Sequence, residues 1–208
     1  MLATFDVLHP SARHLAPAGD VVARAFFDNP IWTYILPSAT QRAHDLAWLM
    51  DMAVRYGERF GQVFATGAPI AGAAVWLPPD ETTITPDRLD EVGFAAMPAR
   101  LGREAFARFE RYFGQLGRMH ATLMPERHWY LIVLGVEPAL QGRGAGSLLL
   151  TPVLDRADRD RLPCYLETAN PRNLGFFARH GFESVGEMSL PGTPRTWLLM
   201  RNPEPERR

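Results

Sequence analysis

The feature that most constrains this chain is a continuous apolar run that leads into a glycine-rich loop. Residues 129–136 read WYLIVLGV, and residues 141–147 read QGRGAGS. A run of β-forming apolar residues is typical of a strand that is buried on both faces of a sheet. Glycines permit positive φ and let a ligand approach the backbone closely. A glycine loop that opens a helix favours an anion, because free N–H groups and the positive helix end point at one place.

Two common phosphate-binding loops do not fit these glycines. A Walker loop needs a Lys that reaches the terminal phosphates of a nucleotide, and all 22 basic residues of this chain are Arg. The dinucleotide fingerprint G-x-G-x-x-G needs a third glycine where the chain has Ser147 or Leu149. The pattern that remains is Q-x-x-G-x-G, which Gln141, Gly144 and Gly146 meet.

The alternation of apolar patterns along the chain predicts a mixed α/β protein with helices packed on a sheet. Strands are expected at 2–8, 62–66, 70–77, 129–136, 163–169, 182–188 and 195–201. Helices are expected at 20–27, 38–60, 144–160 and 171–181, and a helical block at 85–124 is expected to break near Pro98 and Gly102. Ser38 is expected to cap the long helix, Pro152 to kink its helix or end its first part, and Gly181 to end the last helix.

Composition narrows the classes of function. The chain has 208 residues, 47% of them hydrophobic, which fits one domain with a hydrophobic core. Its net charge of −1 gives no sign of the basic surface that binds nucleic acid or an anionic membrane. No apolar run approaches the roughly 20 residues that cross a bilayer, and the first residues do not form a signal peptide. Cys164 is the only cysteine, which excludes an internal disulfide and favours a reducing compartment. We therefore expect a cytoplasmic protein with no metal, membrane or nucleic-acid partner.

The order of motifs resembles the GNAT superfamily of acyl-CoA N-acyltransferases. A buried strand ending in V-x-P at Val136 and Pro138 precedes Q-x-x-G-x-G, and a later strand precedes Asn173 and the pair Gly181–Phe182. The resemblance covers 128–200 well and the first half loosely. Within the superfamily, HWYLIVLGVEPALQGRGAGS, LETANPRNLGFFARHGF and PRTWLLMR look similar to puromycin N-acetyltransferase and its relatives.

The resemblance implies one domain over residues 1–208, built on a central mixed β-sheet of about six to seven strands with helices on both faces. Residues 1–127 would form the acceptor-side half, residues 128–201 the CoA-binding half, and residues 202–208 a frayed tail. It also implies an acetyl-CoA-dependent N-acetyltransferase that transfers the acetyl group directly to a primary amine of a small molecule, as a monomer or homodimer. An acyl-CoA-binding module with little catalysis and an acetyltransferase for protein amines are the alternatives.

The same resemblance assigns the glycine loop to the pyrophosphate of coenzyme A. Backbone N–H groups of residues 142–147 would hold it at the helix N-terminus, and Arg143 would either add a charge contact or stay solvated. The exposed edge of the buried strand would pair with the pantetheine arm, and Gly135 fits a close backbone approach or a bulge. The expected cosubstrate-binding residues are Leu134, Gly135, Val136, Gln141, Gly142, Arg143, Gly144, Ala145, Gly146, Ser147, Asn173 and Phe177.

The sequence departs from the family pattern at the position of the general acid. In much of the superfamily a Tyr four residues before the G-F pair donates a proton to the CoA thiolate, and this chain has Phe177 there. Either solvent or another group protonates the thiolate, or catalysis is impaired. Asn173 matches the position that contacts the pantetheine or phosphate arm, and it also suits a helix cap. We interpret His180 as a residue near a helix C-terminus and Cys164 as a small core residue.

Candidates for the general base are Glu167 first and His128 second. Glu167 stands at the end of a central strand, where α/β sites gather, and His128 has a suitable unperturbed pKa. Glu126 and His120 are weaker candidates, and a chain of waters is an alternative to any single base. The acceptor site is expected in the first half, where Trp32, Tyr34, Trp48 and Tyr56 either line an apolar pocket for a bulky hydrophobic or aromatic amine or pack the core.

Overall fold

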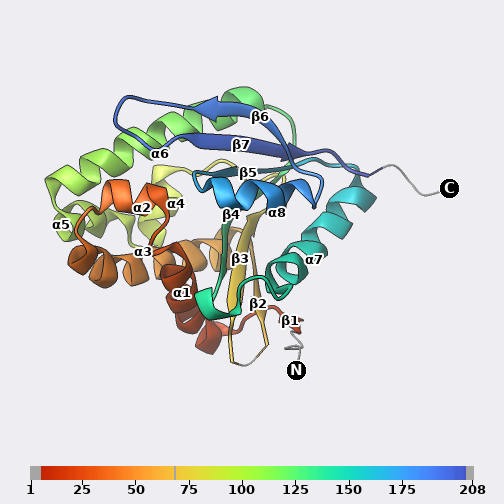
Figure 1. Ribbon diagram of the computed structural model, residues 1–208, viewed down its shortest axis with the longest axis horizontal. Coiled ribbons are helices and arrows are strands. Elements are labelled where there is room, and N and C mark those ends of the chain that lie inside the picture. Colours follow the sequence, from red (N-terminus) through yellow and green to blue (C-terminus); the bar gives the residue numbers. More distant parts are fainter. Residues whose placement is uncertain (1–5, 68, 205–208) are drawn as a thin grey trace.

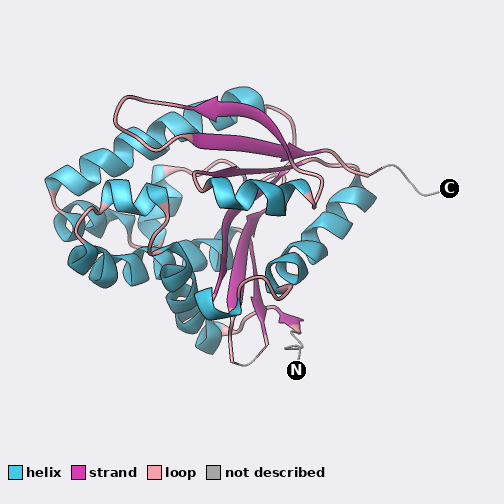
Figure 2. Cartoon of the chain, in the orientation of Figure 1, coloured by secondary structure: helices cyan, strands magenta, loops and turns pink. Residues whose placement is uncertain are grey.

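The protein forms one seven-stranded mixed sheet that carries helices on both faces (Figure 1; Figure 2), which confirms the predicted fold class. This computed structural model describes residues 6–67 and 69–204. The strands, in the spatial order β1-β2-β3-β4-β5-β7-β6, are β1 (Val7–Leu8), β2 (Gln62–Thr66), β3 (Gly72–Leu77), β4 (Trp129–Val136), β5 (Cys164–Thr168), β6 (Glu183–Met188) and β7 (Thr196–Arg201). The helices are α1 (Ala12–Phe26), α2 (Pro30–Ile35), α3 (Ala39–Phe60), α4 (Pro86–Glu91), α5 (Met97–Leu101), α6 (Arg103–Leu123), α7 (Ala145–Asp160) and α8 (Leu174–Ala178), with short 3₁₀ turns at Phe94–Ala96, Pro138–Leu140 and Pro171–Asn173.

The central strand β4 separates from its neighbour β5 part of the way along. These two strands are parallel, and their pairing stops at Leu131, which lies opposite Leu166. At the same level β4 carries a bulge against β3, because Trp76 pairs with Leu131 while Val75 pairs with Val133. An extra residue in one strand bends it and increases its twist. Beyond this point β4 and β5 form a fork with unpaired inner edges.

The bulge also exchanges the faces to which β4 side chains point. Before it, Tyr130 belongs to the core under α1, α3 and α6, while Trp129 and Leu131 belong to the core under α7 and α8. After it, Val133 belongs to the first core and Leu134 packs against the second. A one-residue slip reverses every later side chain, because the side-chain period of a strand is two.

Several helix boundaries differ from the sequence predictions. The helix α1 begins at Ala12, eight residues earlier than expected, and continues through the exposed Pro17 because its apolar face packs on α3 and on the sheet. Likewise α7 continues through Pro152, so the expected end of its first part is wrong. The Ser38 cap is confirmed, since its hydroxyl accepts a hydrogen bond from Gln41 N at 3.3 Å.

Other boundaries agree in part. The block at 85–124 breaks at Gly102, whose φ is +77°, as predicted. The last helix ends at Ala178, and Gly181 follows it with φ +81°. Of the strand predicted at 2–8, only its end is seen as β1, and residues 2–5 lie outside the described residues.

A buried ion pair joins the last strand to α7. Arg201 has a side chain that is 5% exposed, and its two terminal nitrogens donate to the two carboxylate oxygens of Asp158 at 2.7 Å each. Asp158 also accepts the N–H of Glu204 at 2.8 Å. This pair fixes the C-terminal end of α7 against the sheet.

We expect Asp158→Ala to destabilise the protein by about 2–3 kcal/mol at pH 7, because the substitution leaves a buried guanidinium without its partner. The Arg201 guanidinium lowers the pKa of Asp158, so the contribution is present above pH ~4 and is lost as pH falls further. Urea denaturation measures the loss. The control is Asp160→Ala, which breaks the exposed Arg156–Asp160 pair on the same helix and should cost under about 1 kcal/mol. Equal losses would contradict this account.

Candidate functional site

The glycine loop has a backbone that demands glycine at two positions. After β4 the chain makes the Pro138–Leu140 turn and then enters α7 with Gly142 at φ +74° and Gly144 at φ +91°. An added Cβ at either glycine would meet nothing within 4 Å, so backbone conformation, not space, requires them. Gln141 fastens the loop to the strand, because its Nε2 donates to the carbonyl of Val136 at 3.1 Å.

The start of α7 presents free backbone N–H groups. The N–H of Leu148 bonds to Gly144 O at 3.1 Å and closes the first turn, and helix geometry leaves the N–H groups just before it without partners inside the helix. A Cβ on Gly146 would lie 3.1 Å from the ring of Phe176, so a glycine here lets α8 pack against this helix end. The arrangement is a cradle for an anion.

The side chains of this loop differ in exposure. Arg143 is exposed, Ala145 is buried and Ser147 is half-buried. Arg143 is the charged residue of this loop, and its exposed guanidinium can contact an anion bound there.

The inner edge of β4 is open beyond the fork. Glu137 N–H donates to Ala71 O at 2.8 Å, on the β3 side. Backbone groups alternate along a strand, so those of Val136 and Leu134 face the other side. The bond from the Gln141 side chain to the Val136 carbonyl agrees with this orientation. The open edge from residue 132 to residue 136 is about 13 Å long and ends at the glycine loop.

Gly135 serves the packing of α1 on this strand. A Cβ there would lie 3.1 Å from the Cα of Val22, so a side chain would push α1 away from β4. Close backbone approach was one of the two expectations for this residue. The other is wrong, because the bulge lies at Ile132.

Glu167 lies at the mouth of the fork, on the face that α6 covers. It is the first β5 residue beyond the last pair with β4. The hydroxyl of Tyr130 donates to its Oε2 at 2.9 Å, while its Oε1 is shielded from solvent and has no hydrogen-bond partner among the described residues. Burial raises the pKa of Glu167 to about 7. Such a carboxylate is suited to accept a proton near neutral pH.

Three tyrosines surround this carboxylate. Tyr130 and Tyr165 are paired across β4 and β5, with ring centroids 5.6 Å apart. Tyr112 reaches in from α6, and its hydroxyl is 2.5 Å from that of Thr196. Burial raises the pKa of each of these tyrosines, so all three stay neutral. This group could not be recognised from the sequence, because tyrosines inside apolar strands resemble core residues until the strand register is known.

His128 lies at the start of β4, and both of its ring nitrogens are occupied. Its Nδ1 donates to the carbonyl of Glu126 at 2.7 Å, so its Nε2 must accept the Nε2–H of His120, which is 2.7 Å away. Burial lowers the pKa of His120 to about 4 and also lowers that of His128. His128 thus has no free ring nitrogen, the pKa of His120 lies well below neutrality, and Glu126 is exposed. These three residues therefore lack the combination found at Glu167, a shielded oxygen without a partner and a raised pKa.

Phe177 packs into the core on the opposite face of the sheet from Glu167. It is buried next to Phe182, with ring centroids 5.8 Å apart. Asn173 stands at the N-cap position of α8, but its side chain makes no capping hydrogen bond. Its amide donates to Thr168 Oγ1 at 3.5 Å, and Asn170 caps the preceding turn.

Two other expectations for this region are confirmed. His180 lies just past the end of α8, where its Nδ1 donates to the carbonyl of Phe176 at 2.9 Å. Cys164 is buried in the core, and burial raises the pKa of its thiol to about 12. A thiol that remains protonated is a poor nucleophile.

The four aromatic residues proposed for the acceptor site fall into two groups. Trp32 is buried against α6, and Tyr34 lies with its ring 6.3 Å from that of Tyr112. On α3, Trp48 packs under the guanidinium of Arg100, and the buried Tyr56 packs on Phe60. Among these four, Tyr34 is the residue whose ring contacts one of the tyrosines around Glu167.

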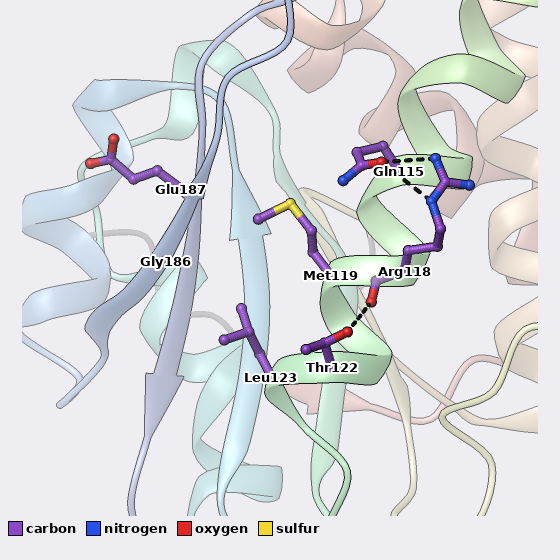
Figure 3. A pocket seen from close by; sticks show the side chains of 7 residues that line it. All are labelled: Gln115, Arg118, Met119, Thr122, Leu123, Gly186 and Glu187. Carbon is purple, nitrogen blue, oxygen red and sulfur yellow. Dashed lines mark hydrogen bonds between the residues drawn. The ribbon is translucent and has the colours of Figure 1, made fainter.

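A groove of about 380 Å³ lies elsewhere, between α6 and β6. Met119 and Leu123 point from α6 toward Gly186 on the edge strand (Figure 3). None of the residues expected to bind a substrate lines it. In the part of the chain that the structure describes, no three acidic, His or Cys side chains gather as metal ligands would. The described helices also include none with the length and apolar character needed to span a bilayer.

The paired histidines generate a prediction about acid stability. Burial holds the pKa of His120 below its unfolded value, so stability is complete above pH ~6.5 and declines as pH falls toward 4. We expect His120→Phe to flatten the fall in Tm between pH 7 and pH 4, since a phenyl ring keeps the stacking on Tyr165 without a titrating group. The exposed His44→Phe is the control and should keep the wild-type slope. An unchanged slope in His120→Phe would rule out His120 as a source of the acid instability.

Comparison with known proteins places the chain in a family. The model of the Acetyltransferase (GNAT) family matches residues 27–182. An uncharacterized N-acetyltransferase of Schizosaccharomyces pombe is 25% identical over 176 residues, which cover 82% of this chain and 71% of that protein.

Solved structures with the same fold include three acetyltransferases. Histone acetyltransferase HPA2 and related acetyltransferase from Corynebacterium glutamicum has a TM-score of 0.72 at 21% identity, covering 98% of this chain and 99% of that one. Polyamine N-acetyltransferase of Drosophila melanogaster has a TM-score of 0.63 at 13% identity, covering 96% and 100%. Arylalkylamine N-acetyltransferase 2 of Aedes aegypti has a TM-score of 0.60 at 12% identity, covering 96% and 99%. The finer likeness to puromycin N-acetyltransferases stays a prediction. This chain is an N-acetyltransferase and belongs to the GNAT family.

Proposed function

We propose that the protein transfers the acetyl group of acetyl-CoA directly to the primary amine of a small molecule. The observation that carries this proposal is the fork in the sheet, whose open edge joins an anion cradle to a carboxylate with a free oxygen. In this proposal the cosubstrate lies along the open edge of β4, from the glycine loop to Glu167. The N–H groups of 142–147, with Arg143, would hold the pyrophosphate, and the edge at Leu134, Gly135 and Val136 would pair with the amide-bearing arm. The thioester would then lie near Glu167.

Glu167 supplies the general base in this proposal. When the amine attacks the thioester carbonyl, a C–N bond forms, the C–S bond breaks, and the nitrogen gives up a proton. The Oε1 atom of Glu167 accepts that proton, because it is unpartnered and its pKa is about 7. This chemistry needs no metal.

No tyrosine acid is assigned to the leaving thiolate. Phe177 has no proton to give and packs on the opposite face of the sheet from Glu167. A thiolate is a stable leaving group in water, so solvent supplies its proton in this scheme. The buried tyrosines near Glu167 are poor acids, because burial raises their pKa values.

A small acceptor fits the way in which helices cover the site. The α1 helix packs on β4, and α6 lies over β5 through Tyr112 and His120, so the fork opens between two helices. Tyr34 on α2, whose ring lies 6.3 Å from that of Tyr112, would bring aromatic surface to the acceptor side, which favours a bulky hydrophobic or aromatic amine. The Drosophila and Aedes enzymes, named for polyamine and arylalkylamine substrates, support this class. The lone Cys164 supports a cytoplasmic compartment.

The loop generates a test of cosubstrate binding. We expect acetyl-CoA at 100 times its Kd to stabilise the protein by about 2.7 kcal/mol in thermal unfolding. Gly144→Ala should cost about 1 kcal/mol of stability, from the left-handed φ, and weaken acetyl-CoA at least tenfold. Gly93→Ala is the matched control, since Gly93 also has positive φ and open space but lies far along the chain from the loop. Equal loss of affinity in both variants, or no stabilisation of the wild type, would refute the assignment.

The base generates a test of catalysis. We expect kcat/KM of the wild type to rise with pH through an apparent pKa of about 7, as Glu167 ionises. Glu167→Gln should lower kcat by about 10²–10⁴-fold and leave acetyl-CoA binding intact, whereas Glu126→Gln should change neither. Thiol release with an arylalkylamine, a polyamine and a peptide amine measures kcat and kcat/KM. Turnover on the peptide alone would favour a protein acceptor, turnover on none would favour a binding module, and full activity of Glu167→Gln would exclude this base.

A further inference from the structure

We infer that Tyr130 is a positioning residue, which holds one oxygen of Glu167 so that the other is the proton acceptor. The inference rests on the proposed function, because it takes Glu167 as the base. In this role Tyr130 acts through the carboxylate of Glu167.

The hydrogen bonding makes the two carboxylate oxygens unequal. A phenol has one proton to donate, and Tyr130 gives it to Oε2 at 2.9 Å. Oε1 is shielded from solvent and has no partner in residues 6–67 and 69–204. A shielded carboxylate oxygen without a donor carries a large free-energy cost, which a proton or a donor from a substrate would remove. Oε1 is therefore the oxygen left for the amine proton.

The ring of Tyr130 is itself held in place. Its centroid is 4.3 Å from that of the His120 ring and 5.6 Å from that of the Tyr165 ring. His120 is stacked on Tyr165 at 4.7 Å with an interplanar angle of 3°, and its Nε2–H is anchored on His128. His128 is anchored in turn on the backbone carbonyl of Glu126. The two histidines thus act as a neutral brace behind the tyrosine.

The titration of Glu167 depends on few neighbours. Tyr130 faces it from β4, Tyr165 from its own strand and Tyr112 from α6, and the residue paired with it on β7 is Leu198. None of these groups is charged near neutral pH. Burial raises the pKa of Glu167. The Tyr130 hydrogen bond opposes that rise most and the Tyr165 hydroxyl opposes it less, because both favour the ionised form.

The experiment removes the hydroxyl and keeps the ring. In Tyr130→Phe we expect the apparent pKa of Glu167 to move to higher pH, kcat at pH 7 to fall about tenfold, and KM for acetyl-CoA to stay unchanged. The shift is read in two ways, from the pH profile of kcat/KM and from a ¹³C NMR titration of Glu carboxyl carbons. The Glu167 signal is assigned by its loss in Glu167→Gln.

Tyr112→Phe is the matched control. It deletes another buried tyrosine hydroxyl of the same group, which is bonded to Thr196 and not to Glu167. We expect it to lower Tm without moving the Glu167 titration. A merely structural role for Tyr130 predicts the same behaviour in Tyr130→Phe, and that result would overturn the inference.

The two readouts keep this inference separate from the proposed function. If the NMR pKa of Glu167 rises in Tyr130→Phe but the wild type acetylates no amine, the hydrogen-bonding role stands and the proposed base falls. If the wild type is active and the NMR pKa does not move, the positioning role is refuted and the proposed function stands.

Discussion

The separation of β4 from β5 is the constraint on which the rest of the site depends. One extra residue in β4, Ile132, bends the strand at the level where its pairing with β5 ends. The same residue reverses the side-chain alternation, so that Gly135 turns toward α1 and allows its backbone to approach. A regular strand could continue to pair with β5 beyond Leu131 and would then leave no open edge.

The chemistry follows from what lies at the two ends of the open edge. At one end, positive-φ glycines and the start of α7 gather backbone N–H groups without partners, a fixed positive site whose strength does not depend on pH. At the other end, Glu167 is placed among neutral tyrosines, so burial dominates and its pKa rises to about 7. In the proposed function, electrostatics therefore separates the two tasks: the loop would bind the anion, and Glu167 would accept the proton.

The strand and the loop were predictable from the sequence because their signals are local. A buried apolar run, two glycines with left-handed φ and a Gln that reaches back to Val136 all act within about ten residues. The Tyr130–Glu167 contact was not predictable, because it joins residues 37 apart and depends on strand register. The start of α1 was missed because packing on the sheet outweighs the local cost of Pro17. The partner of His128, the second choice of base, was not predictable for a similar reason: His120 comes from another element, and their contact occupies the Nε2 of His128.

The most direct measurement of the central claim is a crystal structure of the protein with coenzyme A. The account predicts the pyrophosphate on the N–H groups before α7, the arm hydrogen-bonded to the backbone of Leu134 on the open edge of β4, and the sulfur beside Glu167 Oε1. A sulfur on the Phe177 side of the sheet, or an arm that leaves the fork empty, would contradict it.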